Sequence, residues 1–538
     1  MRAERRKWRA GLTAAIAALA LAGCSLGDPD GAQATGNGDG AGDESNGGTH
    51  TFVAGTGTVP HLNPQIIVSP SVNTVAGSIL EQLTKLSDTF EVQPWLARDW
   101  EVSDDGLTVT LYLEEGVTWH DGEPFTSEDV AFNFEEVMMY QSYGGALVER
   151  IESIALPDDH TVEVTLNAPY GPFMEVLTLQ YLLPKHLYEG TDIIDNPTNM
   201  EQVGTGPFML ERFSEGQEIT MTSNPDYWRG DVPVDRLIFT IQNDTNAGAL
   251  ALLAGETMVG GAGQGMLDQM WAAEHLELTQ RGQLPRQFVF TMNADVPELA
   301  DAEIRKLVYQ SIDRTQVAEV AMPEISYEAS SIYPDELAWL DTDVDLREEF
   351  PYDPDAINAA LDEAGYPRGE DGIRFSLRLH LMGITAEARA VGAVISDSMS
   401  EVGIDVDLTG EDTSVFMENV YERRDFDMAI VEATLGVDPS LGITRWYECN
   451  PEKAQAQNPS GLCDEALQEA ADLALSTADQ EERAEHLAEV EQRALDVMMS
   501  APLVFHTVYT VYNHDQWDGL ENSEGLVGRD WTTVFPTS

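Results

Sequence analysis

One stretch of the chain, residues 94–130, constrains the local structure more than any other. Apolar side chains at positions 107, 109, 111 and 113 alternate with threonine and tyrosine, which is the pattern of a half-buried strand. Acidic pairs followed by Gly106 and Gly116 supply a turn on each side of that strand. Thr126 then suits a helix N-cap, with Asp129 at the capping-box position. The stretch predicts strand, turn, strand, turn and helix start, and all of these roles are structural.

The length and the charge of the chain limit the number of its lobes and the kinds of partner it can bind. With 538 residues, of which 43% are hydrophobic, two or three lobes are expected rather than one very large domain. The chain has 29 Lys and Arg residues against 94 Asp and Glu residues, a net charge of −65. Such a surface repels nucleic acid and anionic lipid headgroups, so a nucleic-acid partner is excluded. We interpret most of this acidity as a solvated surface.

The first 23 residues have the pattern of an export signal. A positively charged start is followed by a short apolar run, residues 11–21, which is too short to span a membrane comfortably. The run ends in Leu21, Ala22, Gly23 and Cys24, which looks like a bacterial lipobox, with cleavage before Cys24 and lipidation of its thiol. An ordinary signal peptide with a chance cysteine is the alternative. Residues 24–48 are rich in Gly, Asp and Ser and predict a flexible tether.

The stretch at 94–130 closely resembles the signature region of the dipeptide- and oligopeptide-binding proteins of ABC importers, extracellular solute-binding protein family 5. The resemblance continues in the same order through most of the remaining chain, about residues 49–538. Further matching segments lie at 62–64, 203–208, 223–228, 254–256, 304–314, 352–366, 401–406 and 438–439. In this family His120 and Asp121 belong to a structural turn, although the pair resembles a catalytic dyad. The sequence contains no nucleophile elbow, zinc-protease motif or P-loop, so no enzyme is expected.

The resemblance implies an α/β protein with the two-lobed type II fold of periplasmic binding proteins. An extra subdomain is expected in the first lobe, and strands at the hinge should cross between the lobes. The first lobe should comprise residues 49–87, 205–286 and 510–538, the extra subdomain 88–204, and the second lobe 287–509. Near the C-terminus, Thr477 is predicted to cap a long helix with Gln480 at the capping-box position. The apolar stripe of that helix, from Ala484 to Met498, is interpreted as core.

The resemblance also places the ligand site between the lobes. A zwitterionic peptide needs a carboxylate for its amine and an arginine for its carboxylate. By position Asp438 is the candidate for the amine, with a plain Asp-Pro turn residue as the alternative. Arg445, beside Trp446, is the candidate for the carboxylate, with a structural ion pair as the alternative. The loop that contains Asn63 faces the cleft in this family.

Two features near the site concern its stability and its specificity. Cys449 and Cys463, in an exported loop-like segment, are expected to form a disulfide, with metal binding as the weaker alternative. Dipeptide-binding relatives carry a tryptophan shortly before the Asp, but residues 431–435 contain none. They also carry an arginine in the loop that corresponds to residues 382–385, and it too is missing. The clamp that selects dipeptides is therefore expected to be absent.

The sequence predicts an extracytoplasmic solute receptor, monomeric and without cofactor, that is attached to the membrane only through lipidated Cys24. It would capture a small ligand, foremost a peptide, by closing its lobes and deliver it to an ABC permease. An oligosaccharide, an opine or a metal chelate in the same fold is the alternative ligand class. A secreted hydrolase is the alternative from a different functional class.

Overall fold

The structure is a computed structural model that describes residues 50–537 except for 68, 88, 262–263, 280–284, 322–324, 338, 341, 384–385, 508 and 521–528. The described residues belong to one compact unit, Thr49–Ser538. The predicted signal peptide, Cys24 and the tether lie outside the described residues, as do Ile384 and Thr385 of the loop at 382–385. No helix in the described part of the chain is long and apolar enough to cross a membrane.

A seven-stranded mixed sheet combines strands from both ends of the chain, in the order β12-β19-β11-β1-β10-β9-β8. Its central strand β1 pairs in parallel with β10 and β11, whereas the other pairs are antiparallel. The strands are β1 (Thr51–Thr56), β8 (Phe208–Ser214), β9 (Glu218–Ser223), β10 (Arg236–Ile241), β11 (Val259–Gly261), β12 (Leu276–Thr279) and β19 (Thr510–Asn513). Helices in the same stretches are α1 (Pro70–Ala76), α6 (Thr245–Leu253) and α7 (Leu267–Trp271).

A four-stranded antiparallel sheet, in the order β4-β5-β7-β6, has a hydrophobic core of its own, which we call the small core. Its strands are β4 (Ala97–Val102), β5 (Thr108–Leu113), β6 (Ile151–Asp158) and β7 (Thr161–Leu166). It is accompanied by β2 (Thr84–Leu86), β3 (Val92–Pro94), α2 (Ser127–Phe132), α3 (Ser142–Val148), α4 (Phe173–Leu177) and α5 (Lys185–Tyr188). The small core contains buried side chains from Leu83 to Leu182.

The local predictions for residues 94–130 are confirmed. Buried and partly exposed side chains alternate along β5, with Val109, Leu111 and Leu113 buried. Gly106 and Gly116, in the turns on either side, have φ values of +67° and +79°, a conformation that glycine adopts at little cost. Thr126 is the N-cap of α2, and its backbone N–H donates to the Asp129 carboxylate at 3.0 Å.

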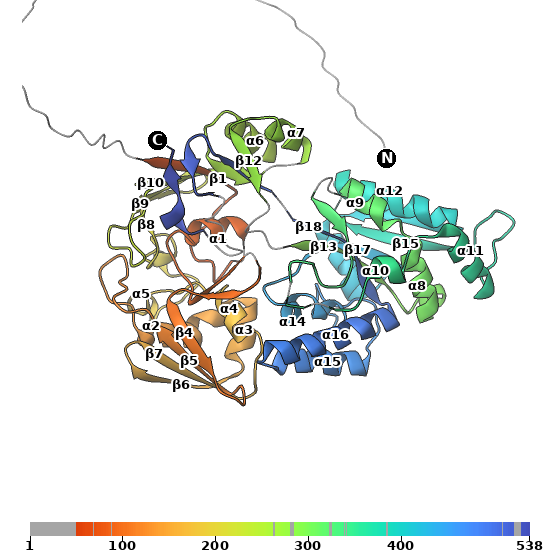
Figure 1. Cartoon of the computed structure of the whole chain (residues 1–538), viewed down its shortest axis with the longest axis horizontal. Coiled ribbons are helices and arrows are strands. Elements are labelled where there is room, and N and C mark those ends of the chain that lie inside the picture. Colours follow the sequence, from red (N-terminus) through yellow and green to blue (C-terminus); the bar gives the residue numbers. More distant parts are fainter. Residues whose placement is uncertain are drawn as a thin grey trace, which may run out of the picture. The chain divides into compact units, whose positions relative to one another are not determined.

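A six-stranded mixed sheet, in the order β14-β18-β13-β17-β15-β16, organises the second half of the chain. Its strands are β13 (Arg286–Met292), β14 (Ser326–Glu328), β15 (Phe375–Met382), β16 (Ile404–Glu411), β17 (Met428–Thr434) and β18 (Ser500–His506). The helices of this half are α8 (Ala302–Gln310), α9 (Arg314–Ala321), α10 (Leu346–Glu349), α11 (Pro354–Glu363), α12 (Ala386–Glu401), α13 (Thr413–Met417), α14 (Pro439–Gly442), α15 (Glu465–Ser476) and α16 (Gln480–Val497). Helices α15 and α16 lie side by side along the edge of this half (Figure 1).

The chain passes twice between the seven-stranded and six-stranded sheets, once from β12 to β13 and once from β18 to β19. The C-terminal residues return to the first of these sheets, where Trp517 and Trp531 pack edge-on against Phe52 of β1. A short two-stranded ribbon, β20 (Trp517–Asp518) with β21 (Phe535–Pro536), completes this end.

The predicted start of the long C-terminal helix is wrong by two residues. The N-cap of α16 is Asp479, whose carboxylate accepts a hydrogen bond from the backbone N–H of Glu482 at 2.9 Å. Thr477 instead terminates α15, and its hydroxyl donates to the carbonyl of Leu473. The backbone is extended at both residues, but only the Asp479 carboxylate bonds to the first turn of α16, whose first helical position is Gln480.

Candidate functional site

Asp438 is fixed in a tight turn at the start of α14. It is the N-cap of that helix, and its Oδ1 accepts a hydrogen bond from the backbone N–H of Ser440 at 2.9 Å. Gly436 has a φ of +74°, and a Cβ on Gly442 would lie 1.7 Å from the carbonyl oxygen of Leu435. The turn therefore requires glycine at both positions, and it leaves the Asp438 side chain only 1% exposed.

Arg483 of α16 pairs with Asp438 and also with a carboxylate from the region of the small core. A single guanidinium nitrogen, Nη2, lies 3.2 Å from Oδ2 of Asp438 and 2.9 Å from Oε1 of Glu175 in α4. The guanidinium carbon lies 5.2 Å from the ring centre of Trp339. Nε and Nη1 of Arg483 are buried and have no hydrogen-bond partner among the described residues. We call Asp438, Arg483 and Glu175 the Arg483 cluster.

The charges of the Arg483 cluster do not balance, since two carboxylates share one guanidinium. Burial raises the pKa of Glu175; Arg483 opposes this rise, and the charge of Asp438 adds to it. Burial alone would lower the pKa of Arg483, but the two carboxylates raise it above its usual value. A buried charge without a partner is costly, so this arrangement favours a proton on Glu175 or a further cation beside it.

Tyr170 adds a polar group to the same place. Its side chain is buried, and its hydroxyl has no hydrogen-bond partner among the described residues. Burial raises the pKa of Tyr170, the guanidinium of Arg150 opposes this, and the nearby charges of Asp438 and Glu175 raise it further. The guanidinium of Arg150 stacks on the tyrosine ring at 4.6 Å. The charges of both carboxylates therefore act on the phenol of Tyr170, and its hydroxyl has no hydrogen-bond partner among the described residues.

The remaining predicted site residues do not join the Arg483 cluster. Arg445 is half-buried, and its guanidinium lies 5.5 Å from the ring of Trp446. It forms no ion pair with any described residue, although its charge acts on Tyr421 and Glu448. Trp446 is only 1% exposed and belongs to the core, so its ring has no open face for a ligand.

Asn63 is also fully buried. Its Nδ2 donates to Oδ1 of Asn199 at 2.9 Å, and its Oδ1 accepts from the backbone N–H of Gln65 at 3.0 Å. Both polar ends of the side chain are therefore engaged inside the protein, and they hold the loop at 62–65 against residue 199.

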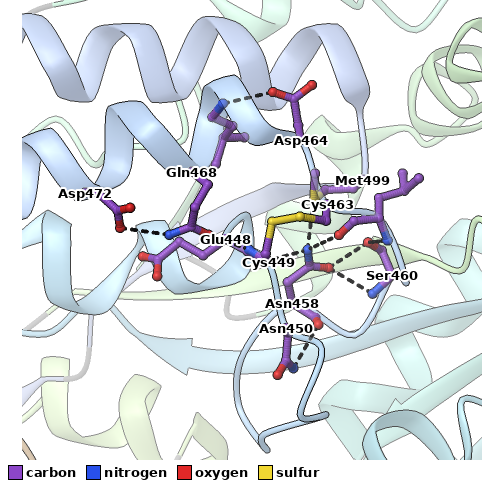
Figure 2. Close-up of a disulfide and its surroundings, with 12 residues drawn as sticks. Glu448, Cys449, Asn450, Asn458, Ser460, Cys463, Asp464, Gln468, Asp472 and Met499 are labelled. Atoms are coloured by element: carbon purple, nitrogen blue, oxygen red, sulfur yellow. Dashed lines mark hydrogen bonds between the residues drawn. A yellow bond between two sulfur atoms is a disulfide. The ribbon is translucent and has the colours of Figure 1, made fainter.

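The predicted disulfide between Cys449 and Cys463 is confirmed (Figure 2). Because the two sulfurs are bonded to each other, they are not metal ligands. Neighbouring polar groups fix the loop around them: the backbone N–H of Cys449 donates to Gln468 at 2.8 Å, and Asn458 donates to the carbonyls of Glu448 and Leu462. Closing a loop of this length contributes about 3 kcal/mol in the chain-entropy model. No group of three potential metal ligands is found among the described residues.

His120 and Asp121 have structural roles, as predicted. Nδ1 of His120 accepts from the backbone N–H of Gly204, so Nε2 carries the proton and donates to the carbonyl of Gly206 at 2.9 Å. Burial lowers the pKa of His120 to about 4, so the ring is neutral at pH 7. Asp121 bonds to His186 instead, at 2.7 Å. The two matched segments at 119–122 and 203–208 are thereby joined to each other.

The sequence reasoning did not identify Arg483 or Glu175. A signal existed for each residue. Arg483 lies four residues before Leu487, in phase with the buried stripe of α16, where an apolar residue is expected. Glu175 is the one charged residue within the apolar run at 172–183. A charge in phase with a buried face needs a buried partner, and that rule would have marked both positions.

Comparisons with known proteins match this chain along most of its length. The family model described as "Bacterial extracellular solute-binding proteins, family 5 Middle" matches residues 91–454. The chain is 24% identical over 461 residues to the dipeptide-binding protein of Escherichia coli, with 80% of this chain and 84% of that protein covered. It is 25% identical over 476 residues to the nickel-binding periplasmic protein of the same organism, with 84% and 88% covered.

A solved structure shows the same fold. The crystal structure of an ABC transporter substrate-binding protein from Listeria monocytogenes superposes with a TM-score of 0.79 at 21% sequence identity. The superposition covers 91% of this chain and all of that chain. The predicted two-lobed α/β fold of type II periplasmic binding proteins is thus confirmed.

Proposed function

The chain belongs to family 5 of the bacterial extracellular solute-binding proteins, and from that premise we propose that its ligand is a peptide with a free amino terminus. Members of this family are extracytoplasmic binding proteins of ABC import systems and are not enzymes. In our proposal the ligand is captured between a first lobe (49–87, 205–286 and 510–538, with 88–204 as its extra subdomain) and a second lobe (287–509). The receptor is a monomer that is attached to the membrane through a lipid on Cys24, and it delivers the peptide to its permease.

The charge imbalance of the Arg483 cluster is the observation that supports a peptide. Asp438 and Glu175 are two carboxyl groups beside one cation of the chain, Arg483. A ligand ammonium supplies the missing positive charge, and Asp438 is its proposed partner. Arg445, which has no ion pair among the described residues, is the proposed partner of the ligand carboxylate. Trp446 and Asn63 are buried, and in this proposal they support the walls of the site without contacting the ligand.

The names of two relatives suggest two ligand classes to compare for this chain. One relative is named for dipeptide and another for nickel. A nickel chelate with carboxylate groups would need cations around it, whereas the Arg483 cluster has an excess of carboxylates. The cluster therefore favours a ligand with a cationic group, and the metal chelate remains the competing class.

Thermal melting with and without ligand tests this proposal. Trialanine and a set of tetrapeptides should raise the melting temperature, since a ligand at a hundredfold excess over Kd stabilises by about 2.7 kcal/mol. N-acetylated forms of the same peptides should have little effect. Stabilisation by a nickel–histidine chelate and by none of the peptides contradicts the proposal, and cleavage of the peptides indicates a hydrolase instead.

Substitution of Asp438 by Asn tests the predicted amine partner. Asparagine keeps the helix cap but removes the charge, so we expect a roughly hundredfold loss of peptide affinity, about 2.7 kcal/mol. Asp353→Asn is the matched control, because Asp353 is also an N-cap before a proline, at the start of α11. Unchanged binding by Asp438→Asn removes Asp438 from the site.

A further inference from the structure

Residues 170–175, in the region of the small core, lie against α15 and α16 of the second half of the chain. The backbone N–H of Gly171 donates to the carbonyl of Leu475, near the C-terminal end of α15, at 2.8 Å. Four residues later, Glu175 pairs with Arg483 of α16 at 2.9 Å. In the proposed division of the chain, residues 170–175 belong to the first lobe and both helices belong to the second. This short segment therefore connects the two lobes at two points.

Gly171 is in close contact with the end of α15. A Cβ at this position would lie 2.4 Å from the carbonyl oxygen of Thr477, 3.1 Å from that of Ala474 and 3.1 Å from Cδ of Arg483. All three atoms belong to the second half of the chain. The φ of Gly171 is not positive, so its own backbone conformation does not require glycine. Glycine is required here only because the other half of the chain approaches so closely.

Apolar side chains surround these polar contacts. Leu441 of α14 and Leu475 of α15 are partly buried and pack against the small core. The side chains of Glu175 and Arg483 are only 13% and 2% exposed, so salt and solvent screen their ion pair little. A backbone hydrogen bond, a buried ion pair and apolar packing thus occur together, which is the composition of a specific interface.

We propose that residues 170–175 form a latch, which binds the ends of α15 and α16 and stabilises the closed arrangement of the two lobes. All contacts of the latch are made by atoms of the chain itself. Asp438 belongs to the same lobe as Arg483, so opening of the latch separates Arg483 from Glu175 and leaves its pair with Asp438 intact. The inference uses the proposed division into lobes, but it does not depend on the identity of the ligand.

The latch affects ligand binding through the population of the closed form. A ligand held between two lobes leaves only when the lobes open, so contacts that exist only in the closed form slow its dissociation. Loss of the latch should therefore raise the dissociation rate constant of the ligand. The association rate constant should not fall, because the open form receives the ligand and the latch contributes nothing to that form.

Hydrogen–deuterium exchange of the ligand-free, full-length protein measures opening of the latch directly. The amide of Gly171 is protected by an acceptor on the other lobe, so it exchanges when the latch opens. Glu175→Gln, which keeps the size of the side chain and removes its charge, should speed this exchange about tenfold. Gly171→Ala should speed it further, because its Cβ cannot fit against the end of α15. The amide of Val176, which donates to Pro172 in the same segment, should keep its rate and so excludes local unfolding.

Small-angle X-ray scattering of the same samples distinguishes opening of the lobes from a local change. Glu175→Gln and Gly171→Ala should both increase the radius of gyration of the ligand-free protein. Gly145→Ala in α3 is the matched glycine control, since a Cβ there would lie 3.4 Å from the carbonyl oxygen of Met139 in the same region. Glu135→Gln, at an exposed glutamate of that region, is the charge control. Both controls should match the wild type in exchange rate and in radius of gyration.

The outcomes separate the latch from the proposed function. Exchange at Gly171 that neither variant changes overturns the latch, and faster exchange with an unchanged radius of gyration also overturns it, because the change is then local. If trialanine binds, its dissociation from Glu175→Gln should be about tenfold faster than from the wild type. If no peptide binds, the proposed function fails, whereas exchange and scattering still decide the latch. If Gly171→Ala does not fold, Glu175→Gln decides it alone.

Discussion

Two buried carboxylate sites in this protein are built in opposite ways. Glu81, which is only 2% exposed, accepts four hydrogen bonds from neutral donors, two on each oxygen. The donors are Trp95, Tyr227, Thr205 and Trp228. In the Arg483 cluster, by contrast, two carboxylates share a single guanidinium nitrogen, and two other nitrogens of that guanidinium have no partner among the described residues.

The two sites also differ in the balance between their cations and their carboxylates. Lys85 lies near Glu81 and Asp530, and Arg229 pairs with Asp530 at 2.8 Å, so two cations face two carboxylates. Burial lowers the pKa of Lys85 to about 8, and Glu81 opposes that shift. The Arg483 cluster has one cation for two carboxylates. A site with matched charges and saturated acceptors holds the fold together, whereas a site short of one cation can take it from a ligand.

Replacement of Glu81 by alanine should give the largest loss of stability. It leaves four buried donors without their acceptor and removes an anion whose charge acts on Lys85, so we expect the free energy of unfolding to fall by about 4 kcal/mol. Urea unfolding of Glu81→Ala measures this, with the exposed Glu91→Ala as the control. Peptide affinity of the folded variant should not change. A loss below about 1 kcal/mol would contradict the structural role of Glu81.

Replacement of Arg483 by methionine should cost about 3 kcal/mol at pH 7, because it leaves two buried carboxylates without a cation. Those carboxylates then have raised pKa values in the folded state, so the folded protein binds more protons than the unfolded protein. Stability of the variant therefore falls as the pH rises, and its deficit should shrink toward pH 4.5. Unfolding of Arg483→Met and Arg483→Lys across that pH range checks this. A deficit that does not change with pH would show that the cluster is not a site of unbalanced charge.

The difference between the two sites also explains what the sequence could predict. Tyr227 and Trp228, which bind Glu81, lie in a segment that matches the family, and the roles of Thr126 and Gly106 follow from residues near them in sequence. These features are local or belong to recognisable motifs. The disulfide was predictable because only two cysteines remain after Cys24.

The residues that meet in the Arg483 cluster could not be predicted from local patterns or motifs. The partner of Arg483 lies 308 residues away, and no local pattern indicates that Glu175 and Asp438 meet at one guanidinium. Asp438 was named as a candidate from its place in the sequence, but its pairing with a cation from its own chain was not predicted. The helix start at Thr477 was predicted wrongly because Thr477 and Asp479 are both good capping residues, and the backbone decides between them.

The smallest expected effect concerns the helix cap that positions Arg483. Asp479 caps α16 four residues before Arg483, so Asp479→Ala should cost about 1 kcal/mol and loosen the first turn of that helix. Thr477→Ala is the matched control, since the Thr477 hydroxyl bonds back into α15 and its replacement should cost less stability.

If the Arg483 cluster depends on this turn, Asp479→Ala should also weaken trialanine binding, whereas Glu81→Ala should not. Thermal melting of the two cap variants with and without trialanine measures both effects. Equal losses from Thr477→Ala and Asp479→Ala would contradict the observed cap, and unchanged trialanine binding in Asp479→Ala would show that the cluster does not depend on the first turn of α16.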